Sequence, residues 1–184
     1  MKVICVLGVG CVGKSIYCRK LLKNYVSAGR PRPVLLQLGA FFRATLGPDF
    51  FTKLDCPTAP VEIEPWVKNC VHNAMSLAWN NSVKNKVDTD MILDGFPRTK
   101  EQLQWLMLSS WVSKHSIDVE VHILYTDEVE LEIRQRKRIS ENPDESKLMA
   151  ERIKSDYSLF TTMNEELNFC CSNYPRFSIK ERMV

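Results

Sequence analysis

The chain lacks a hydrophobic run long enough to cross a membrane, because no apolar stretch approaches the roughly 20 residues that a transmembrane helix needs. It also lacks the pattern of a signal peptide, since the apolar segment Val3 to Leu7 leads into a glycine-rich loop and not into a small-residue cleavage site. We therefore expect a cytoplasmic protein that makes no contact with a membrane.

Paired cysteine motifs and a strong net charge are missing as well. The seven cysteines are odd in number, with neither paired CxxC motifs nor a CxxC followed by HxxxH, so we expect buried free thiols and no disulfides or zinc ligands. A formal net charge of +3 is too small to indicate a general nucleic-acid-binding protein. Internal repeats and low-complexity tracts are absent too, which leaves an ordinary globular protein.

What the chain does contain is an alternation of short apolar runs with segments of helical period. This pattern predicts an α/β fold, in which helices flank both faces of a parallel sheet, and 184 residues suffice for a single domain. Apolar stripes predict helices over Trp66 to Ala78 and Leu103 to Trp111, and Asp127 with Glu130 predicts a further helix start. The five expected strands are Val3 to Leu7, Val34 to Leu38, Met91 to Leu93, Val119 to Tyr125 and Phe177 to Ile179.

A phosphate-binding loop lies between the first strand and the next helical segment. Gly8 to Ser15 reads G-x-x-x-x-G-K-S, whose glycines let backbone amides converge on an anion at the start of a helix. We expect Lys14 to reach the β and γ phosphates of ATP, and Ser15 to bind Mg²⁺. The residues predicted to contact ATP here are Gly8, Val9, Gly10, Cys11, Val12, Gly13, Lys14, Ser15 and Ile16.

A second motif selects among the many enzymes that share such a loop. The third strand runs directly into Asp94-Gly95-Phe96-Pro97-Arg98, which places an acidic residue and then an arginine at the carboxyl edge of the sheet. Together with the phosphate loop, this motif resembles the adenylate kinase family of nucleoside-monophosphate kinases over nearly the whole chain. The resemblance implies a P-loop NTPase fold, with a nucleoside-monophosphate-binding insertion at about 39–75 and a short lid at about 138–144 within one domain, 1–184.

The resemblance also implies the acceptor site. Arg98 would contact the α-phosphate of the acceptor, which suits the bidentate geometry of arginine on phosphate, and Asp94 would hold Mg²⁺ through water. Gly39-Ala40-Phe41-Phe42-Arg43 is similar to the family's Gly-Asp-Leu-Leu-Arg, with Ala40 in place of the aspartate, and gives Arg43 a second contact to the same phosphate. The predicted acceptor-binding residues are Gly39, Arg43, Val61, Gly95, Arg98 and Gln102.

Gln102 bears on the identity of the acceptor. A glutamine four residues after the arginine resembles the adenine-reading residue of adenylate kinases, so AMP is favoured, while UMP/CMP kinases remain the alternative. Thr99 and Gln102 also form a capping box for the helix that they begin, and the two roles are compatible.

Arginines late in the chain predict how the transferred phosphoryl group is stabilised. Arg134 and Arg138 are one helical turn apart, and Arg152 lies on the next predicted helix. The resemblance implies that these arginines close over both nucleotides, with Arg134 also binding ATP and either Arg134 or Arg136 facing the phosphates. The catalytic set is therefore Lys14, Arg98, Arg134, Arg138 and Arg152.

The sequence as a whole predicts reversible transfer of a phosphoryl group from MgATP to a nucleoside monophosphate, with Mg²⁺ as the cofactor. We expect ATP and the acceptor as the partners of a monomer or weak homo-oligomer, without nucleic acid. A catalytically weakened nucleotide-binding interaction module is the alternative, because Ala40 replaces an aspartate and the lid lacks the family's Gly-Arg-x-Asp-Asp element.

Overall fold

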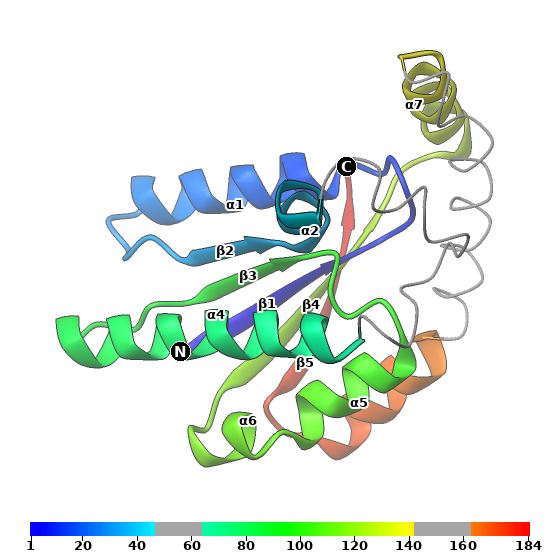
Figure 1. Cartoon of the computed structure of the whole chain (residues 1–184). Coiled ribbons are helices and arrows are strands. Elements are labelled where there is room, and N and C mark those ends of the chain that lie inside the picture. The colour runs from blue at the N-terminus through cyan, green and yellow to red at the C-terminus, as the bar shows by residue number, and fades with distance from the viewer. Residues whose placement is uncertain (47–63, 142–162) are drawn as a thin grey trace.

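A five-stranded parallel sheet organises the protein (Figure 1). The computed structural model describes residues 1–46, 64–141 and 163–184, with Arg43 and Leu46 described by their backbone alone. The strand order is β2-β3-β1-β4-β5, and every neighbouring pair is parallel, which confirms the predicted α/β fold. The strands are β1 (Lys2–Leu7), β2 (Val34–Gln37), β3 (Met91–Asp94), β4 (Asp118–Tyr125) and β5 (Phe177–Met183).

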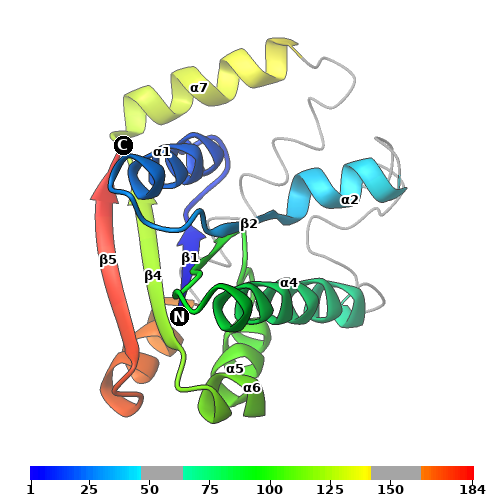
Figure 2. The ribbon, with the colours of Figure 1, turned by 90° about the vertical axis from the view of Figure 1, so that its left-hand side faces the viewer.

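Helices cover both faces of this sheet. Helix α1 lies on one face, and α4, α5 and α6 lie on the other (Figures 1 and 2). Each face has its own apolar cluster, because alternate residues of a strand point to opposite sides. The helices are α1 (Lys14–Ser27), α2 (Leu38–Leu46), α4 (Glu64–Asn85), α5 (Lys100–Leu108), α6 (Ser110–Lys114) and α7 (Glu128–Glu141), and residues 163–173 are helical too.

Local hydrogen bonds set several boundaries that the sequence placed differently. Ser109 has extended backbone, and its hydroxyl accepts a hydrogen bond from the Val112 amide at 3.2 Å, so the single helix predicted to reach Trp111 is two helices. β2 ends at Gln37 because Leu38 already belongs to α2. The predicted cap at Asp127 is confirmed by its Oδ1, which accepts from the Glu130 amide at 2.8 Å.

The predicted insertions are described in part, since residues 47–63 of one and 142–144 of the other fall outside the described ranges. Helix α7 continues through Glu141, so the lid expected at about 138–144 begins as helix, and only its last three positions fall outside the description. Residues 64–75, the last third of the predicted acceptor insertion, form the beginning of α4, whose Val67, Val71 and Met75 are buried in the main core. Both insertions stay predictions as functional units.

Strand β4 buries two ionisable side chains on the face of the sheet that α1 covers. Glu120 and His122 are buried on the α1 side, while their neighbours in the strand fill the core on the other side. The Glu120 carboxylate pairs with Lys2 Nζ at 2.9 Å, Lys180 Nζ at 2.8 Å and His122 Nε2. Tyr17 of α1 completes this polar cluster through a 2.9 Å hydrogen bond between its hydroxyl and His122 Nδ1.

The sequence predicted no membrane-spanning helix and no disulfide, and the described residues bear on both points. None of the helices in residues 1–46, 64–141 and 163–184 is both long and apolar enough to cross a membrane. Six cysteines are described, and all are free thiols. The predicted burial is confirmed for Cys5, Cys18 and Cys170, whereas Cys11 and Cys70 are partly exposed and Cys171 is exposed.

Candidate nucleotide-binding site

The phosphate loop joins β1 to α1 with three residues in left-handed backbone conformations. Gly8 has φ of +144°, Cys11 +68° and Gly13 +107°. At Gly8 a side chain is excluded by space as well, because a Cβ there would lie 2.7 Å from the Leu124 carbonyl oxygen and 2.9 Å from Val12 Cγ1. Glycine is therefore required at position 8 by the contact with β4, and at position 13 by the backbone conformation.

Lys14 folds back over the loop that precedes it. Its Nζ donates hydrogen bonds to the carbonyl oxygens of Gly8 at 2.6 Å and Val9 at 2.8 Å. The ammonium group is thus held at the mouth of the loop, where the phosphates of a bound nucleotide would be expected. A lysine beside the converging amides of a helix N-terminus makes this mouth favourable for anions.

Ser15, in the first turn of α1, meets Asp94 where β1 and β3 reach the carboxyl edge of the sheet. The Ser15 hydroxyl donates to Asp94 Oδ2 at 2.6 Å, and Asp94 is only 8% exposed. The contact follows from the parallel register, in which Val6 near the end of β1 pairs with Asp94. The two residues that the sequence assigned to Mg²⁺ are therefore adjacent.

The donor atoms at Ser15 and Asp94 fit the coordination chemistry of Mg²⁺. Hydroxyl and carboxylate oxygens are hard ligands, and Mg²⁺ bound with a nucleotide takes one or two protein ligands while waters and phosphate oxygens complete its shell. Within residues 1–46, 64–141 and 163–184, no three His, Cys, Asp or Glu side chains gather into an all-protein cage. The arrangement suits a metal that arrives with ATP.

Two further side chains, those of Gln37 and Cys18, lie near the Asp94 carboxylate. Gln37, the last residue of β2, donates from Nε2 to Asp94 Oδ2 at 2.9 Å. The sequence reasoning missed Gln37, although its place at the end of the strand next to β3 is a usable signal. Cys18 lies below on α1, and burial first, then the nearby Asp94 carboxylate, raise the pKa of its thiol, which stays protonated.

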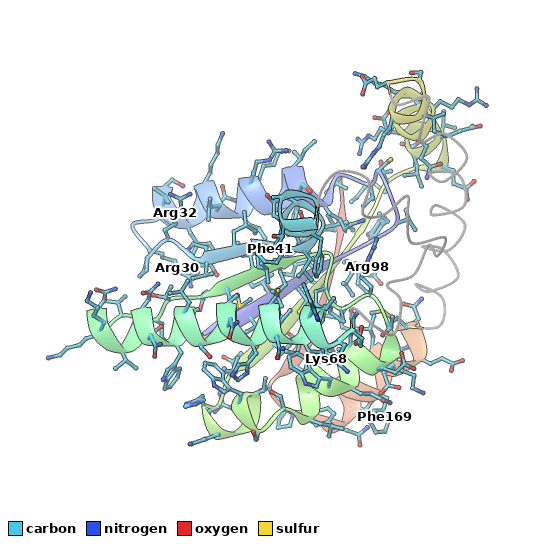
Figure 3. All side chains as sticks on the ribbon, viewed as in Figure 1. Arg30, Arg32, Phe41, Lys68, Arg98 and Phe169 are labelled. Atoms are coloured by element: carbon cyan, nitrogen blue, oxygen red, sulfur yellow. The ribbon has the colours of Figure 1, made fainter. Side chains whose placement is uncertain are left out.

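The predicted acceptor side is built on the loop after β3. Arg98 is exposed, and it lies at the opposite end of the sheet from Arg30 and Arg32 (Figure 3). Its backbone amide donates to Gln102 Oε1 at 2.7 Å, and Gln102 Nε2 donates to Glu64 Oε2 at 2.8 Å. The Gln102 amide also donates to Thr99 Oγ1 at 3.2 Å, which confirms Thr99 as the N-cap of α5. The second bond of the predicted capping box is shifted by one residue, because the Gln102 side chain accepts from the Arg98 amide and not from that of Thr99.

The Gln102 side chain is buried and hydrogen-bonded at both of its polar atoms. The residue is 2% exposed, and both polar ends of its side chain already have protein partners. Its predicted role in reading adenine stays a prediction, and an incoming base would have to share or replace the contact with Glu64. Glu64, at the start of α4, was not singled out from sequence because its partner is 38 residues away.

Helix α7 brings one of the predicted arginines onto the phosphate loop. Arg134 Nη1 donates to the Val12 carbonyl oxygen at 3.1 Å, while its Nε donates to Glu130 at 2.7 Å. Arg136 faces solvent and pairs with Glu132, so of these two arginines Arg134 is the one that reaches the loop. Arg138 is exposed on the last turn of the same helix.

The remaining predicted site residues are described to different extents. Val61 and Arg152 lie outside the described residues, and Arg43 is described only as part of α2. Gly39 lies in the first turn of α2, and Gly95 follows β3 with φ of +80°. Ile16, in the first turn of α1, is 57% exposed. The contacts predicted for these residues stay predictions.

Comparisons with known proteins bear on the fold. No protein-family model matches the chain, and no curated protein matches it. Among solved structures, the chain is similar to a gluconokinase from Sinorhizobium meliloti 1021, with 14% sequence identity and a TM-score of 0.50, over 98% of this chain and 82% of that one. At this identity the likeness bears on the fold alone, and it supports the α/β architecture of a parallel sheet with helices on both faces.

Proposed function

We propose that the protein is a nucleoside-monophosphate kinase that transfers the γ-phosphoryl group of MgATP to AMP and yields two ADP. The observation that carries the proposal is the 2.6 Å contact between Ser15 and Asp94. Asp94 precedes Arg98 by four residues on the segment that leaves β3. A triphosphate-binding loop and an acceptor arginine then share one edge of the sheet, which is where ligands bind in open α/β folds.

The proposed reaction needs positioning and charge more than it needs acid or base chemistry. The acceptor phosphate is itself the nucleophile, so no side chain has to remove a proton or form a covalent intermediate. Lys14 and the loop amides would hold the β and γ phosphates, and Arg134 already lies against the loop. Such groups stabilise the charge that spreads over the transferred phosphoryl oxygens.

Mg²⁺, when bound with ATP, would neutralise charge on the β and γ phosphates, and Ser15 and Asp94 are the residues that would hold it. Arg98 and Arg43 would fix the acceptor phosphate in line with the donor. Arg138 and Arg152 would join Arg134 when the lid covers the nucleotides, which would exclude water and limit the hydrolysis of ATP.

The decisive experiment is an ADP-production assay with MgATP against AMP, CMP, UMP and dTMP, with Lys14→Ala as the control. Gluconate belongs in the same panel because the structural neighbour is described as a gluconokinase. We expect turnover with AMP. Faster turnover with CMP or UMP would support a pyrimidine acceptor, and turnover with gluconate alone would replace the proposed acceptor class.

The alternative of a non-catalytic nucleotide-binding module is tested in parallel by thermal unfolding. A binder that has lost catalysis would be stabilised by ATP and AMP without forming ADP, because any ligand that prefers the folded state raises its stability. Absence of both product and thermal stabilisation would reject the kinase and the module together.

A further inference from the structure

We propose that Gln37 is a positioning residue for the metal site: its amide orients Asp94 and ties the β2–α2 junction to the Mg²⁺ of the bound nucleotide. The proposal rests on the proposed function, because it assigns a role within that same nucleotide site.

The geometry places two donors on one carboxylate oxygen. Asp94 Oδ2 accepts from Ser15 Oγ at 2.6 Å and from Gln37 Nε2 at 2.9 Å. Gln37 and Asp94 are paired in the parallel register of β2 and β3, so their side chains leave the sheet on the same face. A carboxylate oxygen has two lone pairs, and here each has a donor.

This double contact restricts rotation of the Asp94 carboxylate. With Oδ2 occupied twice, the direction of Oδ1 is fixed as well. Oδ1 has no hydrogen-bond partner among residues 1–46, 64–141 and 163–184, so it would be available to a water of the metal shell. The single hydroxyl hydrogen of Ser15 is used on Asp94, which leaves the oxygen lone pairs of Ser15 to face a cation. Without Gln37, Asp94 Oδ2 would keep only the hydrogen bond from Ser15, and the carboxylate could rotate about it.

Gln37 also lies at a junction between two parts of the proposed site. It is the last residue of β2, and α2 begins at the next residue. Helix α2 carries Gly39 and Arg43, which are predicted to bind the acceptor. The amide of Gln37 is therefore a direct hydrogen-bonded link from the acceptor-binding segment to the carboxylate at the metal site.

The test measures binding and needs no catalysis. A non-hydrolysable ATP analogue is titrated by calorimetry into the full chain and into Gln37→Met, once in Mg²⁺ and once in EDTA. Met has a similar size but no donor. We expect equal affinities in EDTA, and a loss of about tenfold in Mg²⁺ for the variant, in line with the usual effect of removing a partner of a metal ligand.

Gln104→Met is the matched control. Gln104 Nε2 also donates to a carboxylate, that of Glu166, at 3.0 Å, but this pair lies on α5 and the 163–173 helix, away from the loop. We expect its affinities to equal those of the unmodified protein in both buffers. If Gln37→Met does not fold, Gln37→Asn, which is one methylene shorter, is expected to show the same Mg²⁺-specific loss.

Two results would overturn the role of Gln37 while leaving the proposed function standing. One is an unchanged affinity in Mg²⁺, and the other is an equal loss in Mg²⁺ and EDTA, which would indicate a purely structural role. If the unmodified protein shows no Mg²⁺-dependent binding of the analogue, both the proposed function and the role of Gln37 are rejected.

Discussion

Arg134 of α7 donates a hydrogen bond from Nη1 to the carbonyl oxygen of Val12, 3.1 Å away and 122 residues earlier in the chain. The same Nη1 lies 3.6 Å from the position of a Cβ built on Gly13. A guanidinium group is thus held against the phosphate loop before any nucleotide is bound, with its Nε fixed by Glu130.

Removal of this guanidinium group tests its part in ATP binding. We expect Arg134→Met to weaken binding of an ATP analogue by about ten- to a hundredfold, because a charge-assisted hydrogen bond to a phosphate contributes about 1.5 to 3 kcal/mol. Fluorescence or calorimetric titration would measure the change. Arg136→Met is the matched control, since Arg136 is 76% exposed and pairs with Glu132, and it should bind as tightly as the unmodified protein.

Arg98 is expected to act on the acceptor and not on ATP. Arg98→Ala should lower kcat/KM for AMP by about tenfold or more, through loss of a phosphate-binding guanidinium, while the affinity for ATP stays nearly the same. Arg32→Ala removes an exposed arginine from the opposite end of the sheet and should change neither quantity (Figure 3). Unchanged turnover in Arg98→Ala would show that the acceptor site is elsewhere.

Gly8→Ala tests the steric basis of the loop. The added Cβ meets the Leu124 carbonyl oxygen at 2.7 Å with φ at +144°, so we expect a loss of about 2 to 5 kcal/mol in the free energy of unfolding and no ATP binding. Gly29→Ala is the comparison, because φ there is +66° but nothing lies within 4 Å. It should cost about 1 kcal/mol and leave binding intact. Equal losses in urea denaturation would contradict the steric argument.

The lowered pKa of Glu120 predicts that the free energy of unfolding decreases at acid pH. Burial by itself raises the pKa of its carboxyl, but hydrogen bonds from Lys180, His122 and Lys2 outweigh burial and hold the pKa at about 2, below the ordinary 4.5. A folded-state pKa below the unfolded value stabilises the fold above pH 4.5, and this stabilisation is lost as the pH falls toward 2. We expect Glu120 to account for about 1 to 3 kcal/mol of that loss.

The measurement is urea denaturation between pH 2 and pH 6 for the unmodified protein and for Glu120→Gln. The variant should be less stable at pH 6, with a flatter dependence of its stability on pH below 4.5. Burial also lowers the pKa of His122, so its protonation acts in the same direction, but it begins below the ordinary value of 6.5. Equal slopes of the two proteins below pH 4.5 would contradict the assignment to Glu120.

The sequence determined those parts of the protein whose causes are local. A strand, a glycine-spaced loop and a helix must follow one another from Lys2 to Ser27, because the apolar run, the glycines and the helical period are contiguous in the chain. The motif after β3 is equally local, and so is the helix cap at Asp127. Alternation of apolar runs and helical segments was sufficient to predict a parallel sheet.

Only the tertiary structure decided which distant side chains meet. The register of neighbouring strands places Gln37 beside Asp94, and the packing of α4 against α5 gives Gln102 a partner in Glu64. The polar cluster around Glu120 has the same origin, since it draws on β1, α1, β4 and β5 at once. Such contacts depend on strand order and helix placement, which no local pattern encodes, and they determine the surroundings of the two residues assigned to Mg²⁺.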